Sequence, residues 1–360
     1  MTGANEQAPK ILDVPIGLDA TGMRQEFDSL GTVEVPADRY WGAQTQRSLE
    51  HFNIGNDRMP KEVYHAYGYV KKAAAVVNTR AGRLPAWKGE LIERVCDEVI
   101  SGALDTEFPL YVWQTGSGTQ SNMNVNEVIS NRCIQLVGGT LGSQEPVHPN
   151  DHVNMGQSSN DTFPTAMHIA AHTMATNKTI PALRRLRDAV ERNSRKWDDV
   201  VKIGRTHLED AVPLTVGQEW SGYTGALDDA IAEVEHATRG LLKLAMGGTA
   251  VGTGLNAPAG FGEQVAAEIA SMTGVPFETA ANKFTAQGTL DRMVRAHAGL
   301  RAAAVTYGVP VILAICSATC SPNPGGAFSP VPTAVPPMAS LSRPWVACST
   351  SVIASSSAPV

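Results

Sequence analysis

A histidine beside hydroxyl and acidic residues is the first feature of this sequence that could do chemistry. It lies in residues 204–210, GRTHLED, where His207 follows Thr206. Because the pKa of an imidazole lies near neutral pH, such a histidine can accept or release a proton during a reaction. Single histidines are also common in structural roles, so this stretch alone leaves both interpretations open.

Two loops rich in hydroxyl and amide side chains could bind a small anion. Residues 115–122 read TGSGTQSN, and residues 157–161 read QSSND. Glycines let backbone N–H groups approach an anion, and the N-terminus of a following helix favours negative charge. The first loop is not a P-loop, because no Gly-Lys-Ser/Thr follows it. Both loops can also be read as N-caps that open the next helix.

The remaining motifs argue against a metal or an organic cofactor. His148, Asp151 and His152 have a spacing that could bind a metal, but Pro149 makes a regular helix unfavourable and favours a surface turn. The five cysteines form no CxxC pair that would indicate zinc. The glycine-rich residues 247–254 lack the GxGxxG pattern of dinucleotide-binding sites. None of these motifs by itself indicates a metal or a cofactor site.

The elements that must position these loops are predicted to be helices. Apolar residues recur at helical spacing in several stretches, and no alternation of strands with helices is found. Residues 1–59 are predicted to be irregular, with at most a short strand at 32–35. The longest stripe, Val216 to Leu241, predicts a helix on the order of 40 Å long, typical of a bundle. Two other predicted helices begin at about residues 60 and 119. Four more span about 85–104, 161–197 with a break near Pro181, 262–272 and 290–305.

Composition and charge exclude several classes of protein. The 360 residues carry a net charge of −6, which argues against a nucleic-acid surface. The first twenty residues lack the patterns of signal and transit peptides, and no apolar run reaches the length of a membrane span. We expect a soluble, cytoplasmic, all-α protein. Its predicted parts are a mostly helical domain at 1–155, a long-helix bundle at 156–305 and a tail at 306–360.

The tail differs from the rest of the chain. Between Thr306 and Val360 the only charged residue is Arg343, and nine of the 22 prolines lie there. This proline spacing argues against long helices. Two explanations stay open, a change of reading frame near residue 305 and a genuine low-complexity segment.

Taken together, the motifs resemble class II fumarase, of the fumarase/aspartase superfamily. The similar segments follow one another in order over about residues 24–305. They are RYWGAQTQRS (39–48), WQTGSGTQSNMNVNEV (113–128), HPNDHVN (148–154), GQSSNDTFPTAMHIA (156–170), GRTHLEDAVPLTVGQE (204–219) and GGTAVGTGLN (247–256). Related aspartases carry glutamine at the position of His207, so the histidine favours fumarase.

The resemblance implies reversible hydration of fumarate to (S)-malate in the tricarboxylic acid cycle by a homotetramer with a shared helical bundle, without a cofactor. His207 would handle the proton of water. A second dicarboxylate site is implied at His148, Pro149, Asn150 and Asp151. The implied ligands of the substrate carboxylates are Ser117, Gly118, Thr119, Ser158, Ser159, Asn160 and Thr206.

One part of the family pattern has no counterpart in this sequence. The family's catalytic serine lies in a loop of the form GSSxMPxKxNP, which also supplies a lysine and an asparagine. No such stretch occurs here, and no lysine follows Lys283. We therefore expect a C-terminally truncated, inactive fumarase with an exposed apolar seam on the 216–244 helix and poor solubility. Two alternatives stay open, a fragment that binds dicarboxylates or assembles with intact subunits, and a lyase of the aspartase or argininosuccinate lyase type.

Overall fold

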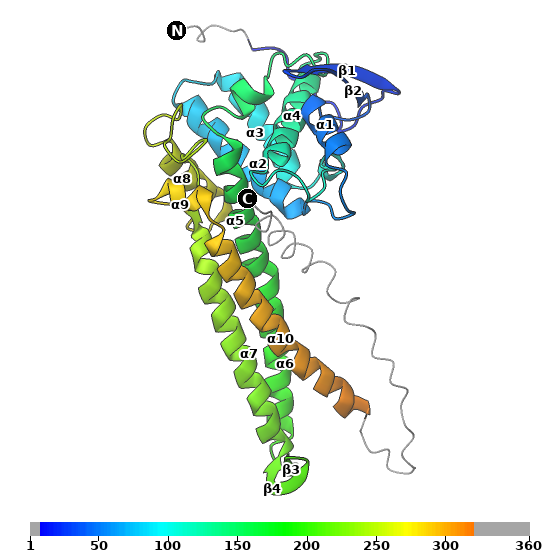
Figure 1. Cartoon of the computed structure of the whole chain (residues 1–360), viewed down its shortest axis with the longest axis vertical. Helices are drawn as coiled ribbons and strands as arrows, with labels where there is room; N and C mark the ends of the chain where they lie inside the picture. Colours follow the sequence, from blue (N-terminus) through cyan, green and yellow to red (C-terminus); the bar gives the residue numbers. More distant parts are fainter. Residues whose placement is uncertain (1–7, 320–360) are drawn as a thin grey trace. The chain divides into compact units, whose positions relative to one another are not determined.

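The computed structural model describes residues 8–319, which form two compact units. Unit 1 contains the described residues up to Ala170 together with 242–290, and unit 2 contains 171–241 and 291–319 (Figure 1). Both are mainly helical, which confirms the predicted fold class. The division into contiguous domains at 1–155 and 156–305 stays a prediction. The two packed units each combine segments that are separate in the sequence.

Unit 1 is built around the helix α2 (Lys61–Arg80), whose apolar face is buried along its length. Around it pack α3 (Ala86–Ile100), α4 (Thr119–Leu136) and α8 (Phe261–Thr273). One continuous core joins them, because apolar residues at helical spacing turn toward α2. The remaining elements of the unit are β1 (Met23–Asp28), β2 (Gly31–Pro36), α1 (Ala43–His51), η1 (Asp105–Glu107), η2 (Pro149–Val153), the first part of α5 (Ser159–Met174), β5 (Lys243–Leu244), β6 (Glu278–Thr279) and α9 (Lys283–Gly288).

The N-terminal segment is more regular than its sequence predicted. β1 and β2 form an antiparallel pair, and α1 follows them. The carboxylate of Glu127, on α4, accepts hydrogen bonds from the backbone N–H groups of Gly42, Gln44 and Thr45 at 2.7–3.1 Å. These are N–H groups that a helix start leaves without partners. The prediction of an irregular segment was wrong because this cap comes from a residue more than 80 positions away.

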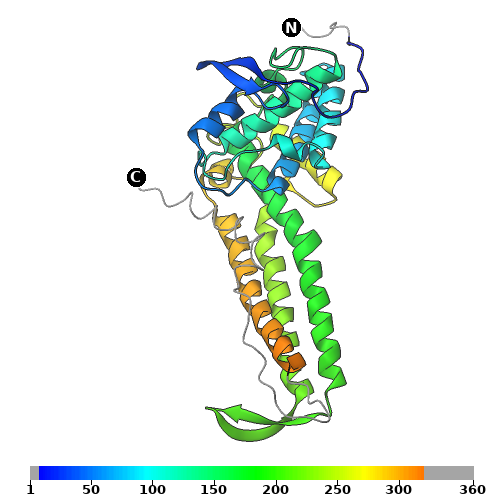
Figure 2. The same ribbon diagram turned by 90° about the vertical axis from the view of Figure 1, so that its right-hand side faces the viewer.

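Unit 2 contains three long helices that lie side by side, α6 (Ile180–Lys196), α7 (Val216–Thr238) and α10 (Asp291–Thr319) (Figures 1 and 2). A five-residue π-helical turn, η3 (Ala175–Thr179), joins α5 to α6, close to the predicted break. The Thr215 hydroxyl caps α7 by accepting a hydrogen bond from the N–H of Gln218 at 3.0 Å. A short 3₁₀ turn, η4 (Arg239–Leu242), ends the helix earlier than predicted.

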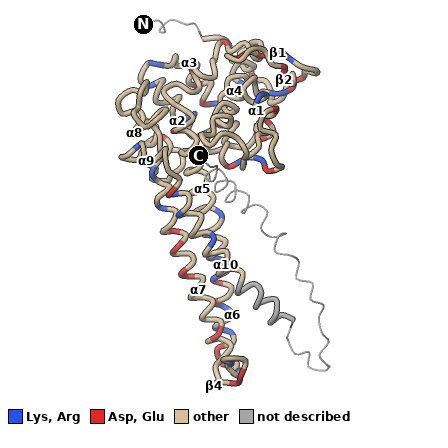
Figure 3. The backbone as a smooth tube through the Cα atoms, viewed as in Figure 1, with Lys and Arg blue, Asp and Glu red and all other residues tan. Residues whose placement is uncertain are grey.

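The apolar seam of α7 is covered in this structure. Trp220, Leu227, Ile231 and Val234 are buried, and they pack against α6 and α10 in two apolar clusters. The expectation of an exposed seam was therefore wrong, because α10 supplies the third helix of the bundle. Charged residues of both signs follow the outer faces of α6 and α7 (Figure 3), where Arg184 pairs with Glu235 and Arg187 with Asp228.

A β-hairpin connects α6 to α7. Its strands, β3 (Val201–Thr206) and β4 (Glu209–Thr215), are antiparallel, with Thr206 opposite Glu209. This hairpin was not predicted, because Pro213 and the charged residues read as a polar loop. Most of its side chains are exposed, and the ion pair of Lys202 with Glu219 at 2.9 Å links it to α7.

The helix α10 extends into the stretch that was expected to lack long helices. It continues past Thr306 and through Pro310 to Thr319. The next proline is Pro322, so the residues between these two prolines are free to form helical hydrogen bonds. The rest of the predicted tail, with Cys320 and Cys348, lies outside the described residues. Among residues 8–319, no helix has the length and apolar character needed to cross a membrane.

Candidate active site

The loop before α4 is shaped by a glycine in the left-handed conformation. Gly118 is the N-cap of α4, with φ 65° and ψ 24°. A Cβ atom built on it would lie 2.2 Å from the ring of Phe163, on α5. Glycine is thus required both for the backbone conformation and for the close approach of the two helix N-termini. The flanking hydroxyls of Ser117 and Thr119 lie 2.9 Å apart.

The loop before α5 meets this first loop. The Oγ of Ser159 accepts a hydrogen bond from the side-chain amide of Asn122, on α4, at 3.1 Å. Its own proton is therefore available for an acceptor such as a carboxylate. The amide of Asn160 donates to the carbonyl of Ala250 in the glycine-rich loop at 2.6 Å. The structure thus brings the two predicted carboxylate-binding loops together within unit 1.

A buried aspartate ties the second loop to the glycine-rich loop. Asp161 is fully buried, and its Oδ1 accepts a hydrogen bond from the N–H of Ser158 at 2.9 Å. Its Oδ2 accepts from the N–H groups of Gly247 and Thr249 at 3.2 and 2.9 Å. Burial raises the pKa of this carboxyl to about 6, while the backbone donors act in the opposite direction. Asp161 therefore holds the loop before α5 and the glycine-rich loop together through one carboxylate.

These loops form the wall of a cavity of about 380 Å³, which suits a small molecule. Ser117, Asn160 and Gln287 give it polar character, and Phe163, Met167 and Phe284 give it apolar surface. No acidic side chain is among the described residues that line it, so a dianion would meet no charge repulsion from the wall. The helices α4 and α5 both begin beside it, and their N-termini favour negative charge.

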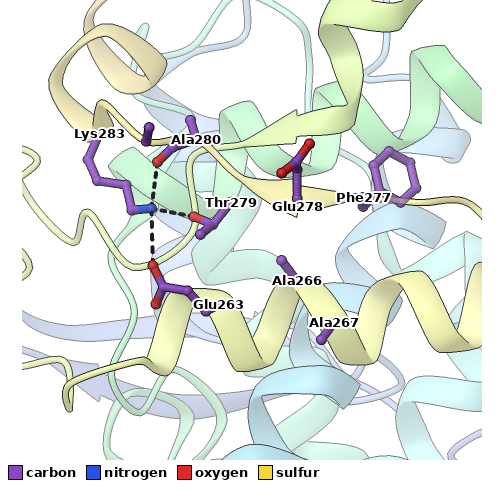
Figure 4. A pocket seen from close by; sticks show the side chains of 9 residues that line it. Glu263, Ala266, Ala267, Phe277, Glu278, Thr279, Ala280 and Lys283 are labelled. Atoms are coloured by element: carbon purple, nitrogen blue, oxygen red, sulfur yellow. Dashed lines mark hydrogen bonds and ion pairs between the residues drawn. The ribbon is translucent and has the colours of Figure 1, made fainter.

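A second cavity of unit 1, of about 340 Å³, has a different character (Figure 4). It is lined by residues of α8, β6 and α9, including the carboxylates of Glu263 and Glu278. The ammonium of Lys283 points to Glu263, Thr279 and the carbonyl of Ala280. Because its lysine is already partnered and two acids line it, this cavity is a poor site for a dicarboxylate.

Thr206 and His207 belong to unit 2, at the tip of the β3–β4 hairpin. His207 and Leu208 form its two-residue turn, and both have positive φ, 52° and 65°. Such turns favour glycine or asparagine, so this His-Leu pair holds an unfavourable backbone conformation. Leu208 is 96% exposed. Strained turns persist where surroundings or function require them, which makes this tip a candidate for contact with another molecule.

The implied second dicarboxylate site forms a compact turn of its own. His148 precedes the π-helical turn η2, and its Nδ1 accepts hydrogen bonds from the N–H groups of Asn150 and Asp151 at 3.2 and 3.1 Å. A ring nitrogen that accepts hydrogen bonds carries no proton, so the Nδ1 of His148 cannot donate to Asp151 at 3.4 Å. Among the described residues, no acidic, histidine or cysteine group gathers in a way that could hold a metal ion.

Sequence reasoning missed Lys71 and the linking roles of Asn122 and Asp161. Lys71 is fully buried, and its ammonium contacts the side chains of Asn122, Asn154 and Gln157 at 2.7, 2.8 and 3.1 Å. One signal could have found it. Lys71 lies one helical turn after Tyr67, on the face of α2 that its apolar residues mark as buried.

Replacing Gly118 by alanine should cost about 2–4 kcal/mol in the free energy of unfolding. The left-handed backbone and the overlap of the new Cβ with Phe163 both contribute. Urea unfolding measures this loss. Gly116→Ala is the matched control from the same loop, because its Cβ would meet nothing within 4 Å. Equal effects of the two substitutions would contradict this account of the loop.

The structure thus combines a mainly helical fold with two polar loops at helix N-termini beside one cavity. A family model described as a lyase matches residues 31–307, so the chain belongs to that family. Within that family its sequence is similar to class II fumarases, as its motifs indicated. The crystal structure of a class II fumarase from Schistosoma mansoni superimposes with a TM-score of 0.80 at 39% identity, over 88% of this chain and 71% of that one.

Curated relatives agree with this assignment. The class II fumarate hydratase of Methanosarcina acetivorans is 71% identical over 297 residues, which cover 82% of this chain and 61% of that protein. The mitochondrial fumarate hydratase of Rhizopus oryzae is 59% identical over 283 residues, which cover 78% of this chain and 57% of that protein. The chain thus spans about three fifths of the length of these relatives.

Proposed function

We propose that this chain carries the carboxylate-binding half and the histidine of a fumarate hydratase site, for reversible hydration of fumarate to (S)-malate. The observation that carries the proposal is the cavity at the N-termini of α4 and α5, with Ser117 and Asn160 in its wall. Ser158 and Ser159 precede and open α5, and Thr119 opens α4. The named relatives support the same reaction.

The chemistry of the reaction requires such a wall. Removing a proton beside a carboxylate places additional negative charge on that carboxylate in the transition state. Fixed hydroxyl, amide and backbone N–H donors stabilise this charge because they need no reorganisation as it develops. The free proton of Ser159 and the two helix N-termini are donors of this kind. They would hold the substrate while a separate group transfers the proton.

We assign to His207 the transfer of the proton of water, and to Thr206 a contact with the substrate. The exposed hairpin tip that carries both residues would complete a site in an assembly of several chains. The resemblance to class II fumarase supports this, since in that family each active site draws residues from three subunits of a homotetramer. A role in the tricarboxylic acid cycle and a cytoplasmic location are supported by the same resemblance alone. We keep a second dicarboxylate site at residues 148–151 as part of the proposal.

Complementation in mixed assemblies tests the proposed function. An intact class II fumarase whose histidine at the position matching His207 has been replaced by alanine retains its serine loop. Refolded together with this chain, it should regain malate dehydration, followed as fumarate absorbance, because His207 would complete mixed sites. The same mixture made with the His207→Ala variant of this chain should stay inactive. Mixed assemblies that form without any regain of activity would refute the assignment of His207.

A further inference from the structure

Lys71 is a buried cation without a carboxylate in contact. It lies in the middle of α2 with no exposed surface, and its three hydrogen bonds go to the amide oxygens of Asn122, Asn154 and Gln157. Among residues 8–319, no carboxylate lies within ion-pair distance of its ammonium. Buried lysines are usually paired with an acid, because transfer of an isolated charge out of water is costly. The positive charge of Lys71 is therefore left without a neighbouring counter-charge.

The groups around Lys71 do not remove this imbalance. Burial lowers the pKa of the ammonium to about 7, and the more distant carboxylate of Asp161 acts in the opposite direction. The ring of Tyr67 lies 5.8 Å from the ammonium, and Cys96 on α3 is the other titratable neighbour. Burial raises the pKa of both groups, so they stay uncharged near neutral pH. An additional anion nearby would favour the charged form of Lys71.

The contacts of Lys71 lead directly to the carboxylate-binding loop. The Oδ1 of Asn122 accepts from Lys71, and its Nδ2 donates to the Oγ of Ser159 at 3.1 Å. The ammonium, together with the Thr162 hydroxyl, thus fixes which way the Asn122 amide points, and that amide in turn donates to the Ser159 hydroxyl. Asn154 and Gln157, the other two partners, flank the turn before α5. One cation therefore orders the segments on both sides of that turn.

We infer that Lys71 is a positioning residue for the dicarboxylate, which orients the Ser159 hydroxyl through Asn122 and supplies a positive charge that the bound dianion balances. This inference rests on the proposed function. It predicts that dianion binding is coupled to protonation of Lys71. With a free pKa near 7, binding at higher pH must take a proton from solution, so affinity should fall up to about tenfold per pH unit until the pKa of the complex is reached.

Calorimetric titration with succinate, a dicarboxylate that cannot be hydrated, tests the coupling. Buffers of different ionisation enthalpy report the protons taken up per succinate bound. We expect nearly one proton at about pH 8.5 and several-fold fewer at about pH 6.5, since Lys71 is then mostly protonated already. Lys71→Met should abolish the uptake and bind succinate at least about tenfold more weakly at the lower pH, because the Met side chain cannot carry the charge.

Lys72→Met is the matched control, because it removes the same charge from the next residue of α2. Lys72 pairs with Asp97 on the protein surface and has no contact with Asn122. It should leave proton uptake unchanged. Uptake that is absent in the unmodified chain, or retained in Lys71→Met, would overturn the inference while leaving the proposed function intact. If Lys71→Met fails to fold, the pH dependence of the unmodified chain still decides, since a pH-independent affinity overturns the inference. No succinate binding at any pH would overturn both proposals.

Discussion

Assayed alone, the 360-residue chain should dehydrate malate no faster than its own His207→Ala variant. The reaction needs a group that removes a proton from carbon, and the family places a serine loop there that this sequence lacks. Loss of one proton-transfer group typically lowers a rate by about 10²–10⁴-fold. Loss of the loop's lysine and asparagine also removes charge and positioning, so we expect a rate at least about 10⁴-fold below that of an intact class II fumarase.

Fumarate absorbance measures this rate, and circular dichroism of the same sample shows that the chain is folded. His207→Ala is an informative control because His207 is exposed in the hairpin turn. Activity well above that control would mean that other residues of this chain replace the serine loop. The proposed function would survive such a result, but the division of the site into two halves would not.

Much of unit 1 and most of the long helices could be predicted because their signals are local. The apolar spacing of Val63, Tyr67 and Val70 is enough to predict α2, and the glycines and hydroxyls near residue 117 are enough to predict the turn before α4. Hydrophobic periodicity depends only on neighbours a few positions apart, which a single sequence displays.

The interactions that escaped prediction join residues far apart in the sequence. Glu127 caps α1 from α4, and Asp161 holds the backbone of Gly247 and Thr249. Nothing in the local pattern near Gly42 or Gly247 identifies these partners. The covered seam of α7 was missed for the same reason, since α10, the third helix of the bundle, lies more than 50 residues further along the chain. Local patterns thus locate helices, whereas the contacts between distant elements can be identified only in the folded structure.

Replacing Asp161 by alanine should lower the free energy of unfolding by about 3–5 kcal/mol. The substitution leaves the backbone N–H groups of Ser158, Gly247 and Thr249 without acceptors. Each buried donor left unsatisfied costs about 1–3 kcal/mol, and broken buried networks are among the substitutions with the largest effects. The glycine-rich loop should also lose its fixed position beside Asn160, so succinate binding should weaken together with stability.

Asp161→Asn separates hydrogen bonding from charge in this network. An asparagine retains one acceptor oxygen, which can serve Gly247 and Thr249, but its amide faces the N–H of Ser158 and cannot accept from it. The expected loss is therefore smaller, about 1–3 kcal/mol by urea unfolding. Two variants with equal losses would indicate that the negative charge stabilises the loops, whereas no loss in either would show that Asp161 does not hold them. The predicted order, alanine worse than asparagine, follows only if Asp161 acts by accepting hydrogen bonds from the three backbone N–H groups.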